Sequence, residues 1–216
     1  MRRRITKQEL KQTCRFCHPP DKDRILLKTQ NFYVMLSLGP IVEGHLLIVS
    51  NQHFECCAEL QGGIVEKFDE IVEKVKLILC QQYGNALLFE HGRSGSSLLP
   101  SSPDKHCFHA HLHCVPTSVD LAAIVECEFS SISLNSWHDF RSIYQDQPRD
   151  YLFIECDNQK RMFFVNREIR RQYLRYKLAT ALGVEKLADW LKAPGWRRIW
   201  KAKKRLSPYF TDLGEK

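Results

Sequence analysis

The chain has 216 residues, of which 44% are hydrophobic and 11% aromatic, so it can bury a sizeable core and disorder is not expected. No apolar run reaches the roughly 18 residues of a membrane-spanning helix, and Met1-Arg2-Arg3-Arg4 leads into polar residues where a signal peptide would be apolar. We therefore expect no membrane segment and a location in the cytoplasm or the nucleus. Nine irregularly spaced cysteines indicate mostly reduced thiols.

The net charge of +7 is concentrated in the C-terminal third. Residues 1–145 hold 15 Lys and Arg against 16 Asp and Glu, whereas residues 146–216 hold 17 against 9 and therefore carry +8. Such a basic segment can attract polyanionic substrates or bind RNA or DNA, and it is equally well explained as a solvated basic helix.

Five short runs rich in β-branched and aromatic residues predict core strands at 31–38, 45–50, 86–90, 107–115 and 122–129. Residues 59–83 carry apolar side chains three and four positions apart and end at Gly84, which predicts a long amphipathic helix. A serine-rich stretch at 92–105, with two glycines and two prolines, predicts a loop that could cover a substrate; whether it gates a site stays open.

After Ser136 the pattern predicts a short helix to Tyr144, a hairpin over 151–165 around Asp157-Asn158, and a helix over about 170–182 ended by Gly183. The expected fold class is α+β: an antiparallel sheet of about five strands with a long helix and a C-terminal α/β extension. We expect residues 1–135 to form one unit and residues 136–216 to form a basic extension packed on it.

The run from Cys107 to Pro116 sets His109, His111 and His113 at alternate positions. On an extended strand the three imidazoles would lie on one face, roughly 6.6 Å apart. The other face would be apolar and pack into the core; it carries Phe108, Ala110, Leu112 and Cys114.

Cys14 and Cys17 have the two-residue spacing that lets two thiolates share a tetrahedral zinc ion. Zinc sites commonly pair such a knuckle with two histidines from elsewhere in the chain. A redox-active cysteine pair is the rival interpretation, but no strand-helix-strand pattern surrounds it.

The segment His109–Val115, read as His-apolar-His-apolar-His-apolar-apolar, resembles the signature of the histidine triad superfamily of nucleotide hydrolases and transferases. Residues 31–54, which include Gly39-Pro40 and His53-Phe54, are similar to the strand, turn and strand before the long helix of that family. Phe89-Glu90-His91-Gly92 followed by the triad is similar to a subgroup with an additional C-terminal segment. The resemblance is strong over 14–116 and weaker over 151–196.

The resemblance implies that His111 attacks the α-phosphate of a nucleotide, giving a nucleotidyl-histidine that water hydrolyses. His113 would donate a hydrogen bond to a phosphate oxygen, and His45 would orient the triad; simple burial is the alternative for His45. The related hexose-1-phosphate uridylyltransferases carry glutamine where this chain has His113, which favours hydrolysis over transfer. In zinc-containing relatives the remaining metal ligands correspond to His53 and His109, so the expected cofactor is a structural zinc.

Further candidate zinc ligands and substrate contacts lie elsewhere in the sequence. His106 is a substitute zinc ligand, whereas His18 is too close to Cys17. Ser37 stands where many family members place an acidic residue that holds the ribose, so ribose recognition is open. The candidate substrate contacts are Glu90, Arg93, Lys105 and Arg175.

The sequence is compatible with three functions. The first is a nucleotidyl hydrolase for a nucleoside phosphoramidate, a dinucleoside polyphosphate or a similar conjugate. The second is removal of a nucleotidyl group from DNA or RNA ends, favoured by the basic extension, where Trp190, Trp196 and Trp200 would stack on bases unless they are packing anchors. The third is a non-catalytic nucleotide-sensing or interaction module. Family members often form dimers, so a homodimer is open too.

Overall fold

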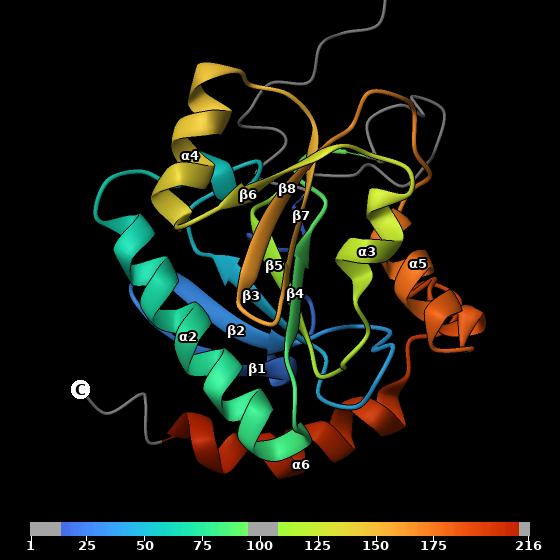
Figure 1. Ribbon diagram of the computed structural model, residues 1–216. Helices are drawn as coiled ribbons and strands as arrows, with labels where there is room; N and C mark the ends of the chain where they lie inside the picture. Colours follow the sequence, from blue (N-terminus) through green and yellow to red (C-terminus); the bar gives the residue numbers. More distant parts are fainter. Residues whose placement is uncertain (1–13, 95–107, 212–216) are drawn as a thin grey trace, which may run out of the picture.

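The computed structural model describes residues 14–94 and 108–211. Eight strands form one sheet in the order β1-β2-β3-β5-β4-β7-β8-β6, and every neighbouring pair is antiparallel (Figure 1). The strands are β1 Ile25–Lys28, β2 Phe32–Leu36, β3 Leu46–Ser50, β4 Leu87–Glu90, β5 His111–Val115, β6 Ser131–Leu134, β7 Tyr151–Cys156 and β8 Gln159–Phe164. The α-helices of the described residues are α2 Ile64–Tyr83, α3 Leu121–Glu126, α4 Trp137–Asp146, α5 Tyr173–Ala181 and α6 Trp196–Thr211.

The expected α+β class is confirmed, but the count of about five strands is wrong. The predicted hairpin is β7 and β8, turning at Asp157 and Asn158 with φ of 48° and 62°. It joins β4 directly, and β6 pairs with β8, so one sheet runs through both predicted units, 1–135 and 136–216. The short strands β1 and β6 have no strong sequence pattern and were not predicted.

The strand predicted at 122–129 is also wrong, because this run forms the helix α3. The side chain of Asp120 caps the helix by accepting from the amide of Ala123 at 2.9 Å. Its buried side chains, Leu121, Ala122 and Val125, follow helical spacing. Tertiary packing and the cap therefore outweigh the β-propensity of Ile124 and Val125.

The other helix predictions are confirmed with bounds that differ by a few residues. The long helix starts at Ile64 instead of residue 59, because Gly62 and Gly63 separate it from a 3-10 turn at Cys57–Glu59. It ends at Gly84, whose φ of 99° is a left-handed conformation that glycine adopts without strain. The helices expected after Ser136 and near residue 170 are α4 and α5.

The two faces of the sheet are covered differently. The core on one face includes side chains from α2, α4 and α6, whereas α3 and α5 cover the β4, β7 and β8 half of the other face (Figure 1). The β2 and β3 half of that second face packs against Phe16 and Ile25 of the N-terminal segment. The second face thus has two separate covers with β5 between them.

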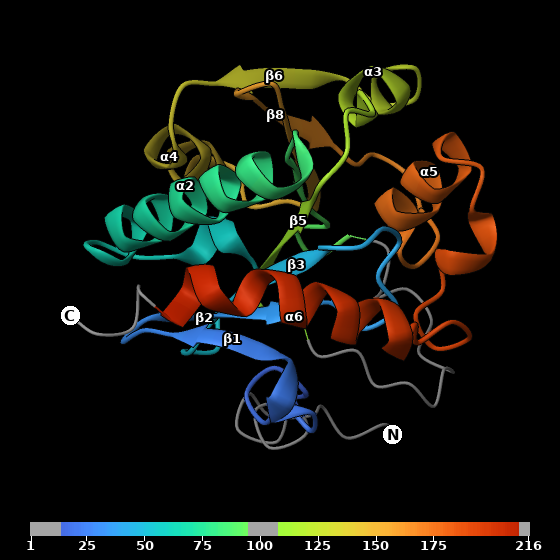
Figure 2. The same ribbon diagram turned by 90° about the horizontal axis from the view of Figure 1, so that it is seen from below.

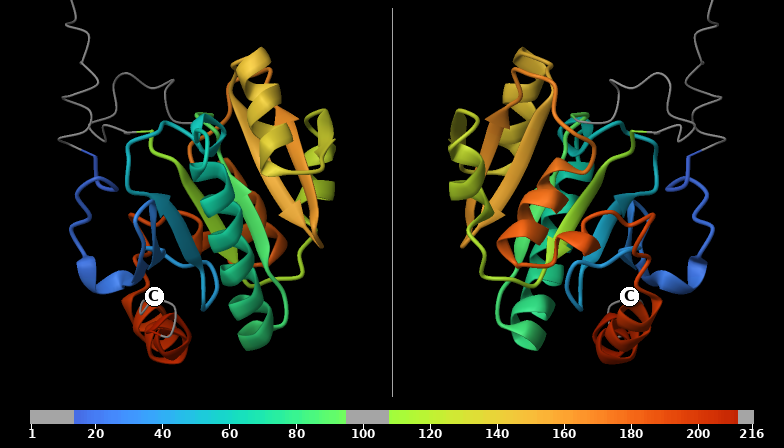
Figure 3. Two further views of the ribbon diagram at one scale, coloured as in Figure 1. Left: turned by 90° about the vertical axis from the view of Figure 1, so that its left-hand side faces the viewer. Right: turned by 90° about the vertical axis from the view of Figure 1, so that its right-hand side faces the viewer.

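Helix α6 lies along β1 and β2, as Figure 2 shows, and at the opposite end of the molecule from α4 in Figure 3. Several of its cations dock it: Arg198 donates to the Pro40 carbonyl at 2.7 Å, and Lys203 donates to the Asp23 carbonyl at 2.5 Å. Trp196 and Trp200 stay 40% and 43% exposed and stack on each other. In the described part of the chain, no helix combines the length and apolarity needed to cross a membrane.

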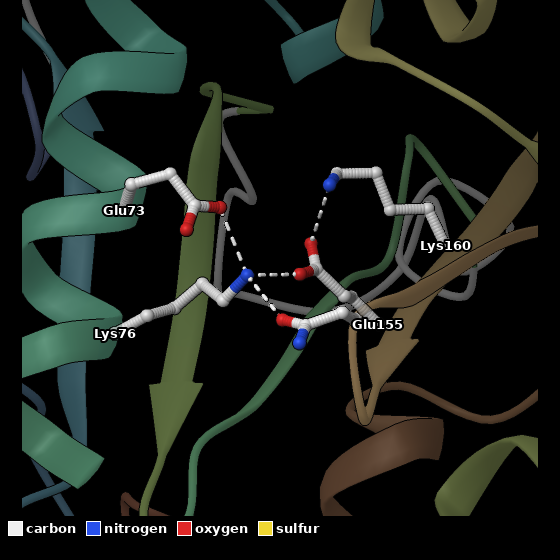
Figure 4. Close-up of polar contacts among 5 residues, drawn as sticks. Glu73, Lys76, Glu155 and Lys160 are labelled. Carbon is white, nitrogen blue, oxygen red and sulfur yellow. Dashed lines mark hydrogen bonds and ion pairs between the residues drawn. The ribbon is translucent and has the colours of Figure 1, made fainter.

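An ion-pair network joins α2 to the β7–β8 hairpin (Figure 4). The ammonium of Lys76 lies 2.5 Å from Glu155 and 2.8 Å from Glu73, and it also donates to Asn158 at 3.0 Å. Lys160 lies 3.5 Å from the second oxygen of Glu155. Glu155 is 1% exposed, so these cations compensate a carboxylate that has lost its water.

Candidate active site and metal site

The strand β5 carries two triad histidines across the middle of the sheet. In the sheet register, His111 lies opposite Val49 and His113 lies opposite Leu47 and Phe89. The Phe89 ring stacks on the His113 ring at 4.5 Å between centroids. The two imidazoles therefore lie on the second face, between its two covers, with ring centroids 5.1 Å apart.

The predicted apolar face of this strand is confirmed for Ala110, Leu112 and Cys114, which are buried in the core beneath α2, whereas Phe108 is half-buried and lies outside that core. The strand itself begins at His111, so His109 lies just before it. Lys105 and His106 lie outside the described residues, as does most of the serine-rich loop.

His111 has one nitrogen committed to the backbone. Its Nδ1 lies 2.6 Å from the carbonyl oxygen of His109, which can only accept, so the Nδ1–H donates. In the neutral ring Nε2 then keeps its lone pair, and the described residues give that atom no hydrogen-bond partner. The Phe16 ring stacks on this imidazole at 4.6 Å. Burial lowers the pKa of His111 to about 4, which favours the neutral form.

His45 and His113 form a directional relay. The amide of Ile41 can only donate, and it lies 3.4 Å from Nδ1 of His45. The proton of a neutral His45 is therefore on Nε2, which donates to Nδ1 of His113 at 2.9 Å. His113 must then carry its own proton on Nε2. The hydrogen bond between His45 and His113 thus leaves the Nε2–H of His113 as a donor, not an acceptor, for a bound ligand.

His91 is a site residue that the sequence analysis missed. The amide of Leu174, in the first turn of α5, donates to its Nε2 at 3.1 Å, and its ring lies 6.0 Å from that of His113. It follows Phe89 by two positions, and this alternation was the available signal. Burial lowers the pKa of His91 to about 3.

Arg175 supplies positive charge without facing outward. The residue is 2% exposed and donates to the carbonyls of Ala188 at 2.9 Å, Gly39 at 2.5 Å and Leu187 at 3.3 Å. Burial lowers the pKa of Arg175 to about 10. Its charge also contributes, after burial, to lowering the pKa of four histidines: His45, His91, His111 and His113.

Glu90 faces away from the triad, because it follows Phe89 on β4 and successive side chains alternate. One carboxylate oxygen accepts from the amide of Cys57 at 2.8 Å and the other from the hydroxyl of Tyr151 at 2.6 Å. Burial raises the pKa of Glu90 to about 7, although both hydrogen bonds act in the opposite direction. Glu90 therefore joins the 3-10 turn at Cys57–Glu59 to the strand β7, in which Tyr151 lies.

The remaining candidates near the sheet also have protein partners. The guanidinium of Arg93 lies 3.3 Å from the carboxylate of Glu55 and 3.5 Å from the hydroxyl of Tyr144. Ser37 is buried, and its hydroxyl donates to the Leu38 carbonyl at 3.2 Å. Its amide donates to the His45 carbonyl at 2.9 Å, so Ser37 borders the relay.

The predicted metal ligands lie together. Cys14, Cys17, His53 and His109 each offer one ligand atom, and these atoms all lie within 4.8 Å of one another. The Sγ–Nδ1 distances from Cys14 to His109, Cys17 to His53 and Cys17 to His109 are 3.4, 3.2 and 3.6 Å, and the two Nδ1 atoms are 3.2 Å apart. Ligands held tetrahedrally about 2.0–2.3 Å from one zinc ion lie about 3.3–3.8 Å apart.

The protonation of His109 also fits a metal site. Its Nε2–H donates to the backbone carbonyl of Ser50 at 2.8 Å, which leaves Nδ1 deprotonated toward the cysteines. A backbone acceptor of this kind orients ligating histidines in metal sites. The four residues form a candidate metal site whose donor set is consistent with zinc.

The solved structures to which this chain is similar are distant from it. A hypothetical histidine triad nucleotide-binding protein from Sulfolobus tokodaii is 18% identical, with 91% of this chain and 98% of that chain covered and a TM-score of 0.39. A zinc-bound histidine triad family protein from Mycobacterium smegmatis is 16% identical over 63% of this chain and 96% of that one, with a TM-score of 0.39. Yeast Ap4A phosphorylase in complex with AMP is 14% identical over 84% and 80%, with a TM-score of 0.45.

The comparison with curated proteins gave no match. The family model described as "Protein similar to CwfJ C-terminal" matches residues 1–130, more than half of the 216-residue chain. That span includes the candidate metal site, the histidine relay and the triad strand. The chain therefore belongs to the family of proteins similar to the CwfJ C-terminal region.

Proposed function

We propose that this protein is a nucleotidyl hydrolase that works through a covalent nucleotidyl-histidine at His111. The observation that carries the proposal is the hydrogen bond from Nδ1 of His111 to the His109 carbonyl, because it leaves the Nε2 lone pair available. The donor that the relay provides at His113 lies on the neighbouring ring, where it can bind an oxygen of the attacked phosphate.

The reaction has two displacements at the α-phosphorus. First, Nε2 of His111 forms a bond to phosphorus, and the leaving group departs with the electron pair of its bond to phosphorus. An amine leaving group takes up a proton from solvent as it departs. Then water attacks the same phosphorus, the N–P bond breaks, and a nucleoside monophosphate leaves while the water proton passes to solvent. The Nε2–H of His113 stabilises the charge that develops on the phosphate oxygens in both steps.

The metal would have a structural role. Cys14, Cys17, His53 and His109 would hold a zinc ion with four protein ligands, which leaves no open coordination position for catalysis. What these residues do for the site is to hold the N-terminal segment so that Phe16 packs against the His111 ring.

The substrate is a nucleoside phosphoramidate, a dinucleoside polyphosphate or a similar nucleotide conjugate. A second candidate is removal of a nucleotidyl group from a DNA or RNA end; the observation that favours it is the +8 charge of residues 146–216. Helix α6 weakens this support, since several of its cations dock the helix onto the protein. The third alternative is a nucleotide-binding module without catalysis.

The test is hydrolysis of adenosine phosphoramidate, diadenosine tetraphosphate and 5′-adenylated DNA by wild type and His111→Ala. Turnover that falls by at least about a thousandfold in the variant supports the proposal. His138→Ala is the matched control, because this exposed histidine pairs with Glu66 on the far side of the sheet from the triad. Nucleotide binding without turnover of any substrate would favour the non-catalytic module instead.

A further inference from the structure

We propose that Arg15, Arg171 and Trp190 form a binding site for the phosphates of the leaving group. The inference rests on the proposed function, because it takes His111 to face the α-phosphate. Within the proposed substrate class it favours conjugates whose leaving group carries phosphate, such as a nucleoside polyphosphate or the 5′ end of a nucleic-acid strand.

The three side chains form a compact cationic cluster. The guanidinium carbon of Arg15 lies 5.1 Å from the centroid of the Trp190 ring, and that of Arg171 lies 5.8 Å from the same centroid. Arg15 is exposed, and the other two side chains are half-buried. Two guanidinium groups at one ring can both donate to the oxygens of a phosphate group bound between them.

Each of the three comes from a segment attached to the histidine site. Arg15 belongs to the cysteine knuckle and immediately precedes Phe16, whose ring stacks on His111. Arg171 precedes the first turn of α5, where the Leu174 amide binds His91. The cluster is therefore connected to the histidine site through both segments that cover the second face of the sheet, the cysteine knuckle and α5.

Trp190 packs against the turn that precedes the His45–His113 relay. A Cβ atom added to Gly39 would come within 2.5 Å of the Trp190 Cα, so this turn packs directly against the tryptophan backbone. Two residues later, the Ile41 amide donates to His45. The position of Trp190 relative to the relay is thus fixed through a short, tightly packed turn.

The chemistry of the cluster suits phosphates beyond the attacked one. Guanidinium groups bind phosphate oxygens through paired, charge-assisted hydrogen bonds, and a tryptophan ring offers a face on which a base can stack. An amine leaving group, as in a phosphoramidate, offers nothing to these side chains. The cluster therefore distinguishes substrates with a phosphate-bearing leaving group from substrates with an amine leaving group, whereas the triad alone does not.

The test measures dissociation constants in the His111→Ala background, where turnover is removed. The ligands are AMP, diadenosine tetraphosphate and 5′-adenylated DNA, and the variant is Arg15→Ala with Arg171→Ala. The matched control is Arg149→Ala with Arg167→Ala, which removes two other arginines that lie over aromatic rings, Phe164 and Phe129. It lowers the net charge by the same amount.

We expect the Arg15 and Arg171 double variant to weaken one or both phosphate-extended ligands at least about tenfold and AMP by less than about twofold. The ligand that is weakened identifies the source of the phosphates. Equal weakening of AMP, equal weakening by the control, no weakening at all, or no preference of the parent protein for extended ligands over AMP would overturn the inference. Adenosine phosphoramidate turnover tests the proposed function separately, because its leaving group has no phosphate.

Discussion

At the residue scale, the tautomers of the histidines in the site follow from backbone groups whose roles as donor or acceptor are fixed. A backbone amide can only donate and a backbone carbonyl can only accept, so Ile41 and the His109 carbonyl assign the tautomers of His45 and His111. No charged partner is needed for this assignment. The same logic gives the metal-facing tautomer of His109 through the Ser50 carbonyl.

In the proposed mechanism His45 acts through His113, as a positioning residue whose effect depends on its N–H donor. Replacing it with leucine removes the hydrogen bond to His113 and is expected to lower kcat on adenosine phosphoramidate about 10- to 100-fold. His45→Gln keeps an N–H donor and should recover part of that loss. Unchanged kcat in His45→Leu, or the same loss in both variants, would contradict the relay.

Glu90 makes stability depend on pH. Its folded pKa of about 7 lies above the value near 4.3 of an unfolded glutamate, so the folded chain binds the proton more tightly. Its contribution to stability is full below about pH 4 and is lost as pH rises through 7. The unfolding free energy of wild type relative to Glu90→Gln should thus fall by on the order of 3 kcal/mol between pH 4 and pH 8. Urea titrations at both pH values measure it, and a constant difference refutes it.

The triad histidines and the two knuckle cysteines were predictable because each set forms a local sequence motif. His53 was assigned through the resemblance to zinc-containing relatives, and the structure places it with the other three ligands. The position of Arg175 was not predictable from one sequence, since its partners Gly39 and Ala188 are distant in the chain. The direction of Glu90 depends on where β4 begins, which the sequence does not define to one residue.

At the element scale, the Lys76 network should contribute much more than an exposed pair on the same helix. Lys76→Met leaves the buried Glu155 with only Lys160 nearby, and we expect it to lower the unfolding free energy by about 3 kcal/mol. The control is Lys67→Met, which breaks the exposed pair with Glu70 and should cost less than about 1 kcal/mol. Similar losses in the two variants would show that burial does not strengthen the network.

Element prediction succeeded where a long period or a glycine marked the boundary, as in α2 and at Gly84. It failed at α3, where a six-residue helix has too few turns for its period to outweigh β-branched residues. The strand β6 alternates poorly in burial, and its pairing with β8 depends on the hairpin. Such short elements are defined by tertiary partners rather than by their own residues.

At the scale of the whole molecule, zinc is expected to stabilise the N-terminal cover of the sheet. Cys17→Ser should lose the metal and lower the Tm by about 10 °C or more, because the knuckle holds Phe16 over Tyr33 and Leu47. His18→Ala, next to the same cysteine but outside the ligand set, should keep one zinc per chain. Metal analysis with thermal unfolding gives both values. A metal-free wild type, or equal metal in Cys17→Ser, contradicts the assignment.

The measurement that tests the central claim most directly is capture of the covalent intermediate. Wild type is mixed with each nucleotide conjugate and quenched on the millisecond scale, and the protein is analysed by intact mass and by peptide mapping. We predict a nucleoside monophosphate adduct on His111, absent from His111→Ala. Turnover by wild type with no adduct, or an adduct of the same amount in His111→Ala, would contradict the account.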